Sequence, residues 1–182
     1  MKLIIHTLDS APAASVPLLE GIREQIGLAP NLACAIAESP VTLGAFDGLR
    51  RAAAATSIDP VHREIAGLAT GVVVDNHYGV AFHSTMLANL GVAGDDIERM
   101  RAGQAPSEHA PAVVYRLATE LASGRGKVAD ATIAEAKLIG YTPETILELA
   151  TEIHFASLVG LVDNLAGRVE LDGFLEAQAW TK

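Results

Sequence analysis

Three residue pairs, each a capping side chain followed by proline, fix where helices begin in this chain: Ser39-Pro40, Asp59-Pro60 and Thr142-Pro143. A Ser, Thr or Asp side chain accepts hydrogen bonds from the free amides of a first helical turn, and proline suits the first helical position because that amide has no helical partner. Alanine and leucine dominate the chain, and aromatic residues make up only 4% of it. Because Ala and Leu favour helices and aromatic residues favour strands, the sequence predicts an all-α fold.

Stop signals divide the chain into about eight helices, which we assign to a single domain over residues 1–182 with an N-terminal arm at 1–14. The expected helices cover residues 16–27, 32–38, 40–55, 60–90, 95–102, 106–123, 129–138 and 143–164. Asp75-Asn76 interrupts the apolar pattern of the fourth segment, so we expect two helices that meet near residue 75. A docked tail is expected from Gly167 onward.

Composition limits the classes of partner. The 13 basic and 22 acidic residues give a net charge of −9, which disfavours nucleic-acid binding. Half of the residues are hydrophobic and the mean hydropathy is +0.30. The longest run of apolar and small residues, 65–74, nevertheless has only ten residues, whereas a membrane span needs about 20. We therefore expect no membrane partner and a homo-oligomer that covers the excess apolar surface.

The single cysteine, Cys34, forms no internal disulfide, and we expect a cytoplasmic protein.

One segment carries residues suited to chemistry. Glu64, Gly67 and Gly71 lie on one face of a predicted helix, where the glycines let another helix or a ligand come close. Seven residues turn a helix through about 700°, so Asn76 and His83 share a face of the next one. If the two faces meet, Glu64 and His83 form a proton-relay pair. The plainer alternative is that the glycines only permit helix packing and that Glu64 faces water.

The segment resembles the core of the carboxymuconolactone decarboxylase and alkylhydroperoxidase D-like (AhpD-like) family. The resemblance rests on Arg63-Glu64-Ile65, on a twelve-residue step to Asn76-His77-Tyr78-Gly79, and on four more residues to His83. It extends over residues 26–172, with supporting matches at 28–31, 39–40, 91, 103–106 and 140–144. It implies an AhpD-like helical fold and a homo-oligomer, commonly a trimer or hexamer, with the site near subunit contacts.

Peroxidase members of that family hold a Cys-x-x-Cys pair in this core. Asn76 and Gly79 occupy the two cysteine positions here, whereas the family's glutamate and histidine match Glu64 and His83. Peroxide reduction by such a pair needs one thiolate to attack and a second thiol to resolve the sulfenic acid. The resemblance therefore implies that the proton-relay positions are kept and the redox positions are lost.

Three functions stay open. The first is a lyase- or decarboxylase-like enzyme in which Glu64 and His83 act as acid and base on a small organic molecule. The residues expected to bind that molecule are Asn76, Tyr78, Gly79 and Phe82. The second is a catalytically silent oligomeric binding protein in which the same pair makes structural bonds. The third is a peroxiredoxin-like alkylhydroperoxidase that uses Cys34 with external thiols, which requires an exposed Cys34 with a lowered pKa.

Other polar residues carry weaker signals. Arg50, Arg51 and Arg63 are candidates for binding an anion, but we interpret them as surface charge. The remaining histidines have no ligand-like spacing, and no phosphate-binding, flavin or nicotinamide motif is present. We therefore expect neither a metal nor a cofactor.

Overall fold

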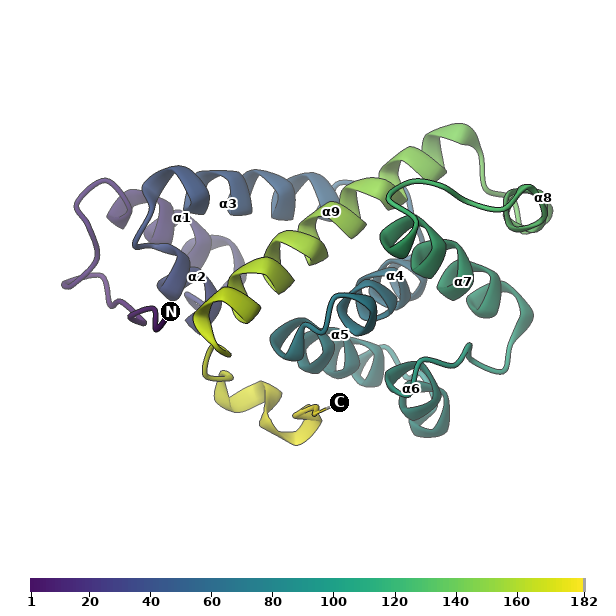
Figure 1. Cartoon of the computed structure of the whole chain (residues 1–182). Coiled ribbons are helices and arrows are strands. Elements are labelled where there is room, and N and C mark those ends of the chain that lie inside the picture. The colour runs from purple at the N-terminus through teal and green to yellow at the C-terminus, as the bar shows by residue number, and fades with distance from the viewer. Residues whose placement is uncertain (182) are drawn as a thin grey trace.

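The computed structural model describes residues 1–181, and helices dominate it (Figure 1). The elements in chain order are α1 (Val16–Ile26), α2 (Asn31–Ile36), α3 (Pro40–Ala54), α4 (Pro60–Val73), α5 (His77–Asn89), α6 (Gly94–Arg101), α7 (His109–Ser123), α8 (Asp130–Leu138), α9 (Pro143–Ala166) and the 3₁₀ helix η1 (Gly173–Gln178). The all-α prediction is confirmed.

The three cap–proline pairs begin α3, α4 and α9 as predicted. The Ser39 hydroxyl accepts from the amide of Thr42, the Asp59 carboxylate from those of Val61 and His62, and the Thr142 hydroxyl from that of Thr145. Each cap thus satisfies amides that the first turn leaves without a helical partner.

Helix α7 begins later than the sequence predicts, at His109 instead of residue 106. The Asp96 carboxylate accepts hydrogen bonds from both the amide and the hydroxyl of Ser107, at 2.8 and 2.9 Å. This contact with α6 holds the segment before His109 outside the helix. The pattern at 106–108 is helical, but a tertiary contact overrides it.

Helix α9 joins the two halves of the molecule. It contacts α2 and α3 on one side and α4, α5 and α7 on the other (Figure 1). One cluster of buried apolar residues is built from α4 to α9, and a second is built from α1 to α3, parts of α5 and α9, and the tail. The cavity described below has walls from both halves.

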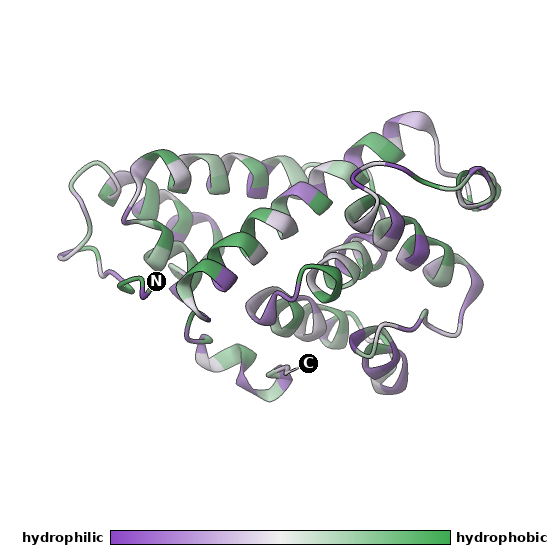
Figure 2. Cartoon of the chain, in the orientation of Figure 1, coloured by the Kyte–Doolittle hydropathy of each residue, from purple (hydrophilic) through white to green (hydrophobic). Residues whose placement is uncertain are grey.

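Helix α9 also carries exposed apolar surface. In length and composition it is the one helix among residues 1–181 that would suffice for a membrane span, but it packs against five other helices and buries Glu152 and Asp163. Leu147, Leu161 and Leu165 on it are exposed, and hydrophobic residues run along its length in Figure 2. The homo-oligomer expected from the composition stays a prediction.

Glycines set how closely α4, α5 and α9 approach. The break between α4 and α5 falls at Asp75, whose φ of 56° ends the first helix, as expected. A side chain on Gly67 would overlap the His83 ring, and one on Gly71 would press on Val80. On α9, Gly160 leaves room for Val74 at the same junction. The predicted close packing at Gly67 and Gly71 is therefore present.

The two chain ends dock onto the helices. In the N-terminal arm, His6 is buried and its Nε2 lies 2.8 Å from the Glu38 carboxylate. In the tail, the Asp172 carboxylate accepts from the amide of Asn31 at 3.1 Å and from the hydroxyl of Tyr78. These bonds place η1 beside α2 and α5, where it forms one wall of the cavity.

Replacing Gly67 by alanine should displace the His83 ring and destabilise the fold by about 1–3 kcal/mol, the usual cost of overpacking a core. Gly48 on α3 is the matched control, because a methyl there meets no atom within 4 Å. G48A should be neutral or stabilising by up to about 1 kcal/mol. Urea unfolding of both variants measures the difference, and equal stability of G67A and G48A would contradict the packing described.

Candidate functional site

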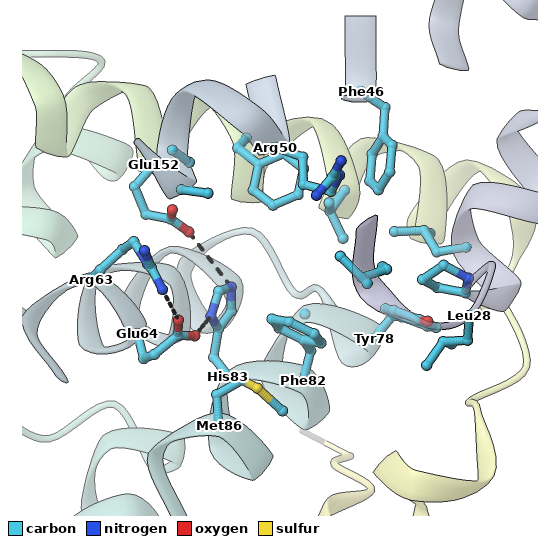
Figure 3. Close-up of a pocket in the computed structure, with 18 of the residues that line it drawn as sticks. Leu28, Phe46, Arg50, Arg63, Glu64, Tyr78, Phe82, His83, Met86 and Glu152 are labelled. Atoms are coloured by element: carbon cyan, nitrogen blue, oxygen red, sulfur yellow. Dashed lines mark hydrogen bonds and ion pairs between the residues drawn. The ribbon is translucent and has the colours of Figure 1, made fainter. Parts of the chain in front are cut away.

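A cavity of about 440 Å³ lies between the two halves of the molecule (Figure 3). Its walls come from α1, α2, α3, α4, α5, α9, η1 and the segment between α1 and α2. Most of the lining is apolar, but Glu64, His83 and Glu152 gather at one end of it. A cavity of this size encloses a small organic molecule, and an apolar lining with a few convergent polar groups is typical of such sites.

A short polar contact in the cavity joins Glu64 of α4 to His83 of α5. Glu64 Oε2 and His83 Nδ1 are 2.8 Å apart, and both side chains are buried. The ring of His83 packs directly against Gly67. A side chain at position 67 would overlap the ring, so the glycine is what allows His83 to reach Glu64. The predicted meeting of Glu64 and His83 is thus present, and both residues line a cavity and not a filled core.

Glu152 of α9 is a third charged member of this end, and the sequence interpretation missed it. Its Oε1 lies 3.9 Å from His83 Nε2, which is too long for a hydrogen bond. The residue is 3% exposed. One signal was available: Glu152 follows Leu149 by three residues and precedes Ala156 by four, which places a carboxylate on the buried face of α9.

The three groups shift one another's protonation. Burial favours neutral His83, but its hydrogen bond to Glu64 and the charges of Glu64 and Glu152 outweigh burial and raise its pKa. Burial likewise disfavours ionised Glu64, but its hydrogen bond with His83, the His83 charge and Arg63 outweigh burial and lower its pKa. For Glu152 burial dominates and raises the pKa to about 6. The contact therefore favours the ion-paired form of Glu64 and His83, beside a Glu152 carboxyl group with a pKa of about 6.

Two of the three arginines interpreted as surface charge line the cavity instead. Arg63 Nη2 lies 3.2 Å from Glu64 Oε1, and its side chain is 27% exposed. Arg50 also lines the cavity, with a side chain 16% exposed. Arg51 alone matches the prediction, with a side chain 61% exposed. The earlier interpretation is wrong for Arg50 and Arg63, because α3 and the first turn of α4 present them to the cavity.

Aromatic residues concentrate in this cavity. The chain has four phenylalanines, and all four line it: Phe46, Phe82, Phe155 and Phe174. Phe46 and Phe155 pack ring to ring with centroids 5.4 Å apart. Tyr78 adds a fifth aromatic ring. In a chain with 4% aromatic residues, this gathering favours a flat, apolar ligand.

The four predicted binding residues divide into two groups. Tyr78, Gly79 and Phe82 line the cavity, whereas Asn76 does not appear among its lining residues in 1–181. The prediction that Asn76 faces the ligand is wrong. Its Oδ1 accepts from the Gly79 amide at 2.8 Å and so caps α5, and its fully buried side chain also donates to the Ala156 carbonyl at 3.4 Å. Gly79 leaves the space that this cap occupies.

Cys34 lacks the features of a reactive thiol. It is buried in α2, and its sulfur contacts the Ala29 carbonyl at 3.6 Å. Burial, followed by the charge of Asp172, raises the pKa of the thiol. A peroxidase that uses Cys34 requires this thiol to be exposed and its pKa to be lowered. Cys34 instead is buried and has a raised pKa. Within residues 1–181, no set of three or more His, Cys, Asp or Glu side chains is arranged to hold a metal ion.

Comparison with known proteins agrees with the fold. The model of the carboxymuconolactone decarboxylase family matches residues 40–120. A solved AhpD core, an uncharacterized peroxidase-related protein from Ralstonia eutropha JMP134, is 18% identical with a TM-score of 0.80, over 96% of this chain and 94% of that chain. An uncharacterized peroxidase-related protein from Silicibacter sp. TM1040 is 16% identical with a TM-score of 0.78, over 97% and 95% of the two chains.

A debrominase, Bmp8, solved as a variant in complex with 2,3,4-tribromopyrrole, is 14% identical with a TM-score of 0.71, over 89% of this chain and 87% of that chain. No curated protein sequence matches the chain. At these identities the solved structures establish the AhpD-like fold, and the roles of the side chains rest on the geometry above.

Replacing Glu152 by glutamine should stabilise the protein at alkaline pH and leave it unchanged in acid. The folded state raises the pKa of Glu152 from 4.5 to about 6, so it binds the proton more tightly than the unfolded state. The free energy of unfolding therefore falls as pH rises from 4.5 to about 6, and above this range it is lower by about 2 kcal/mol. Urea unfolding near pH 4 and near pH 8 measures the effect. A stability difference between E152Q and the parent that does not change with pH would contradict the burial described.

Proposed function

We propose that the chain performs acid/base chemistry on a small aromatic molecule. The carboxymuconolactone decarboxylase family model matches residues 40–120, the fold is AhpD-like, and the chain lacks the Cys-x-x-Cys pair. The observation that carries this proposal is the buried Glu64–His83–Glu152 cluster at one end of an aromatic cavity. No thiol takes part in the proposed reaction.

His83 is the proposed proton donor. Glu64 binds Nδ1 and leaves Nε2 as the ring atom available to a ligand. Because the pKa of His83 is raised, the ring keeps its Nε2 proton to higher pH than an ordinary histidine and can pass it to a ligand atom. Glu64 orients the ring and stabilises the imidazolium, and it keeps its own negative charge throughout.

Glu152 is the proposed proton acceptor. Its pKa of about 6 keeps the carboxylate mostly ionised near neutral pH while making it a stronger base than an ordinary glutamate. Its Oε1 and His83 Nε2 are 3.9 Å apart, so one ligand atom beside the line that joins them can hydrogen-bond to both. A donor and an acceptor thus meet at the same point of the ligand.

The ligand proposed is small, flat and largely apolar. The five aromatic rings of the lining supply broad faces for such a molecule. The debrominase with the same fold binds 2,3,4-tribromopyrrole, a compound of this description. Removal of bromine is not proposed for this chain, because the buried Cys34 offers no thiolate for a redox step.

The alternative of a silent binding protein shares the cavity but predicts no proton transfer. A chromophore that reports its own ionisation separates the two functions. 4-Nitrophenol is an aromatic acid that ionises near neutrality, and its anion absorbs at longer wavelength than the neutral form. Proton transfer to Glu152, with the anion stabilised by the His83 imidazolium, should convert bound nitrophenol to its anion below the pH at which free nitrophenol ionises.

We expect the absorbance of the bound anion in the parent protein at about pH 6, a loss of most of it in E152Q and H83A, and a partial loss in E64Q. His154 is the matched control, since it is an exposed histidine on α9 two residues from Glu152. H154A should behave like the parent, and so should protein treated with a thiol-alkylating reagent. Binding of neutral nitrophenol with no shift in any of these proteins would favour the silent function.

A further inference from the structure

Arg50 is a cavity-facing cation that the proton chemistry does not use. It extends from α3, and Figure 3 shows its guanidinium beside the ring of Phe46, away from the Glu64–His83–Glu152 end. Its Nε and Nη2 donate to Asp47 Oδ1, at 3.1 and 2.7 Å. The side chain is largely buried, so its charge is shielded from solvent to a great extent.

The charge of Arg50 is only half balanced by the protein. The Asp47 carboxylate that it contacts is shared with Arg51, whose Nε lies 3.0 Å from Oδ2. Two guanidinium groups therefore share one carboxylate, and the group has a net charge of +1. The other end of the cavity is balanced, because Arg63 and His83 face Glu64 and Glu152. The uncompensated positive charge in the cavity thus belongs to α3.

Arg50 also keeps free hydrogen-bond donors. Its Nη2 donates a further bond to the side chain of Gln25, but Nη1 has no acceptor among residues 1–181. This unpartnered Nη1 is not buried, so a ligand atom can reach it. A guanidinium edge with free N–H groups and a net positive charge matches a carboxylate of a ligand.

We propose that the cavity selects aromatic molecules that carry a carboxylate, with Arg50 as the residue that binds the carboxylate. The ring then lies among the phenylalanines, and an atom of the ligand reaches His83 and Glu152. This assignment names the substrate class of the proposed acid/base site and rests on that function. Arg50 is a binding and positioning residue in it, because it contacts the ligand away from the proton transfer.

The net charge of the protein does not explain such a preference. The chain carries −9 overall, which repels anions at long range. Selection of an anion by this cavity therefore depends on a local contact. Added salt, which screens long-range interactions, should weaken this selection only slightly. A charge-assisted hydrogen bond in a desolvated site is worth about tenfold or more in affinity.

The test uses three probes with the same ring and chain: 3-phenylpropanoate, 3-phenylpropan-1-ol and 3-phenylpropylamine, which are anionic, neutral and cationic. Isothermal titration calorimetry at neutral pH measures each affinity. The parent protein should bind the carboxylate at least about tenfold more tightly than the alcohol, and the amine more weakly than either. R50Q should abolish the preference for the carboxylate, and R50K should keep part of it.

Arg51 provides the matched control, since it contacts the same Asp47 from the same helix but is exposed. R51Q leaves Asp47 to Arg50 alone but keeps the free Arg50 donors, so it should reduce the preference much less than R50Q does, and thermal unfolding of each variant establishes that it is folded. Equal affinity of the parent for carboxylate and alcohol would overturn the inference, as would a preference that survives in R50Q or disappears equally in R51Q.

The outcome is separable from that of the proposed function. If nitrophenol binds and ionises while the three probes bind equally, only the role of Arg50 fails. If nitrophenol and all three probes fail to bind, the aromatic site itself fails and this inference fails with it.

Discussion

The bond between Glu64 and His83 is the contact on which the rest of the site depends. It joins two buried, ionisable side chains from successive helices at 2.8 Å, and burying either charge alone would be strongly unfavourable. The break at Asp75 turns α5 back onto α4, and Gly67 leaves space for the ring. Backbone geometry, glycine placement and charge pairing therefore all support one contact, which uses Nδ1 of a histidine that lines the cavity and leaves its Nε2 out of that bond.

Charge is distributed unevenly around that space, and this division gives the cavity two functional ends. The charges of Glu64, His83, Glu152 and Arg63 balance one another at one end, whereas the α3 side carries an excess positive charge on Arg50. The phenylalanines lie on the walls of the same cavity. Five of the eight aromatic residues of the chain line this cavity, and the other three lie in the core cluster built from α4 to α9.

Local signals in the sequence were sufficient for most of the fold and for half of the site. Caps, prolines and glycines predicted the helices, because those residues act on the backbone within one turn. The positions of Glu64 and His83 predicted their meeting, because the two helices are consecutive in the chain and glycines beside Glu64 let the second helix come close. Glu152 was missed because its role depends on how α9, some 70 residues later, is rotated about its axis. Asn76 was misassigned for a related reason: the same amide that can bind a ligand also caps α5, and only tertiary structure decides between these uses.

The central claim, that Glu64 fixes and charges His83 beside the cavity, is tested most directly by ¹⁵N NMR of the His83 ring across pH. The account predicts that Nδ1 remains protonated throughout, that Nε2 titrates with a pKa above the ordinary 6.5, and that E64Q lowers this pKa. Titration at or below the ordinary value, or a pKa that E64Q leaves unchanged, would contradict it.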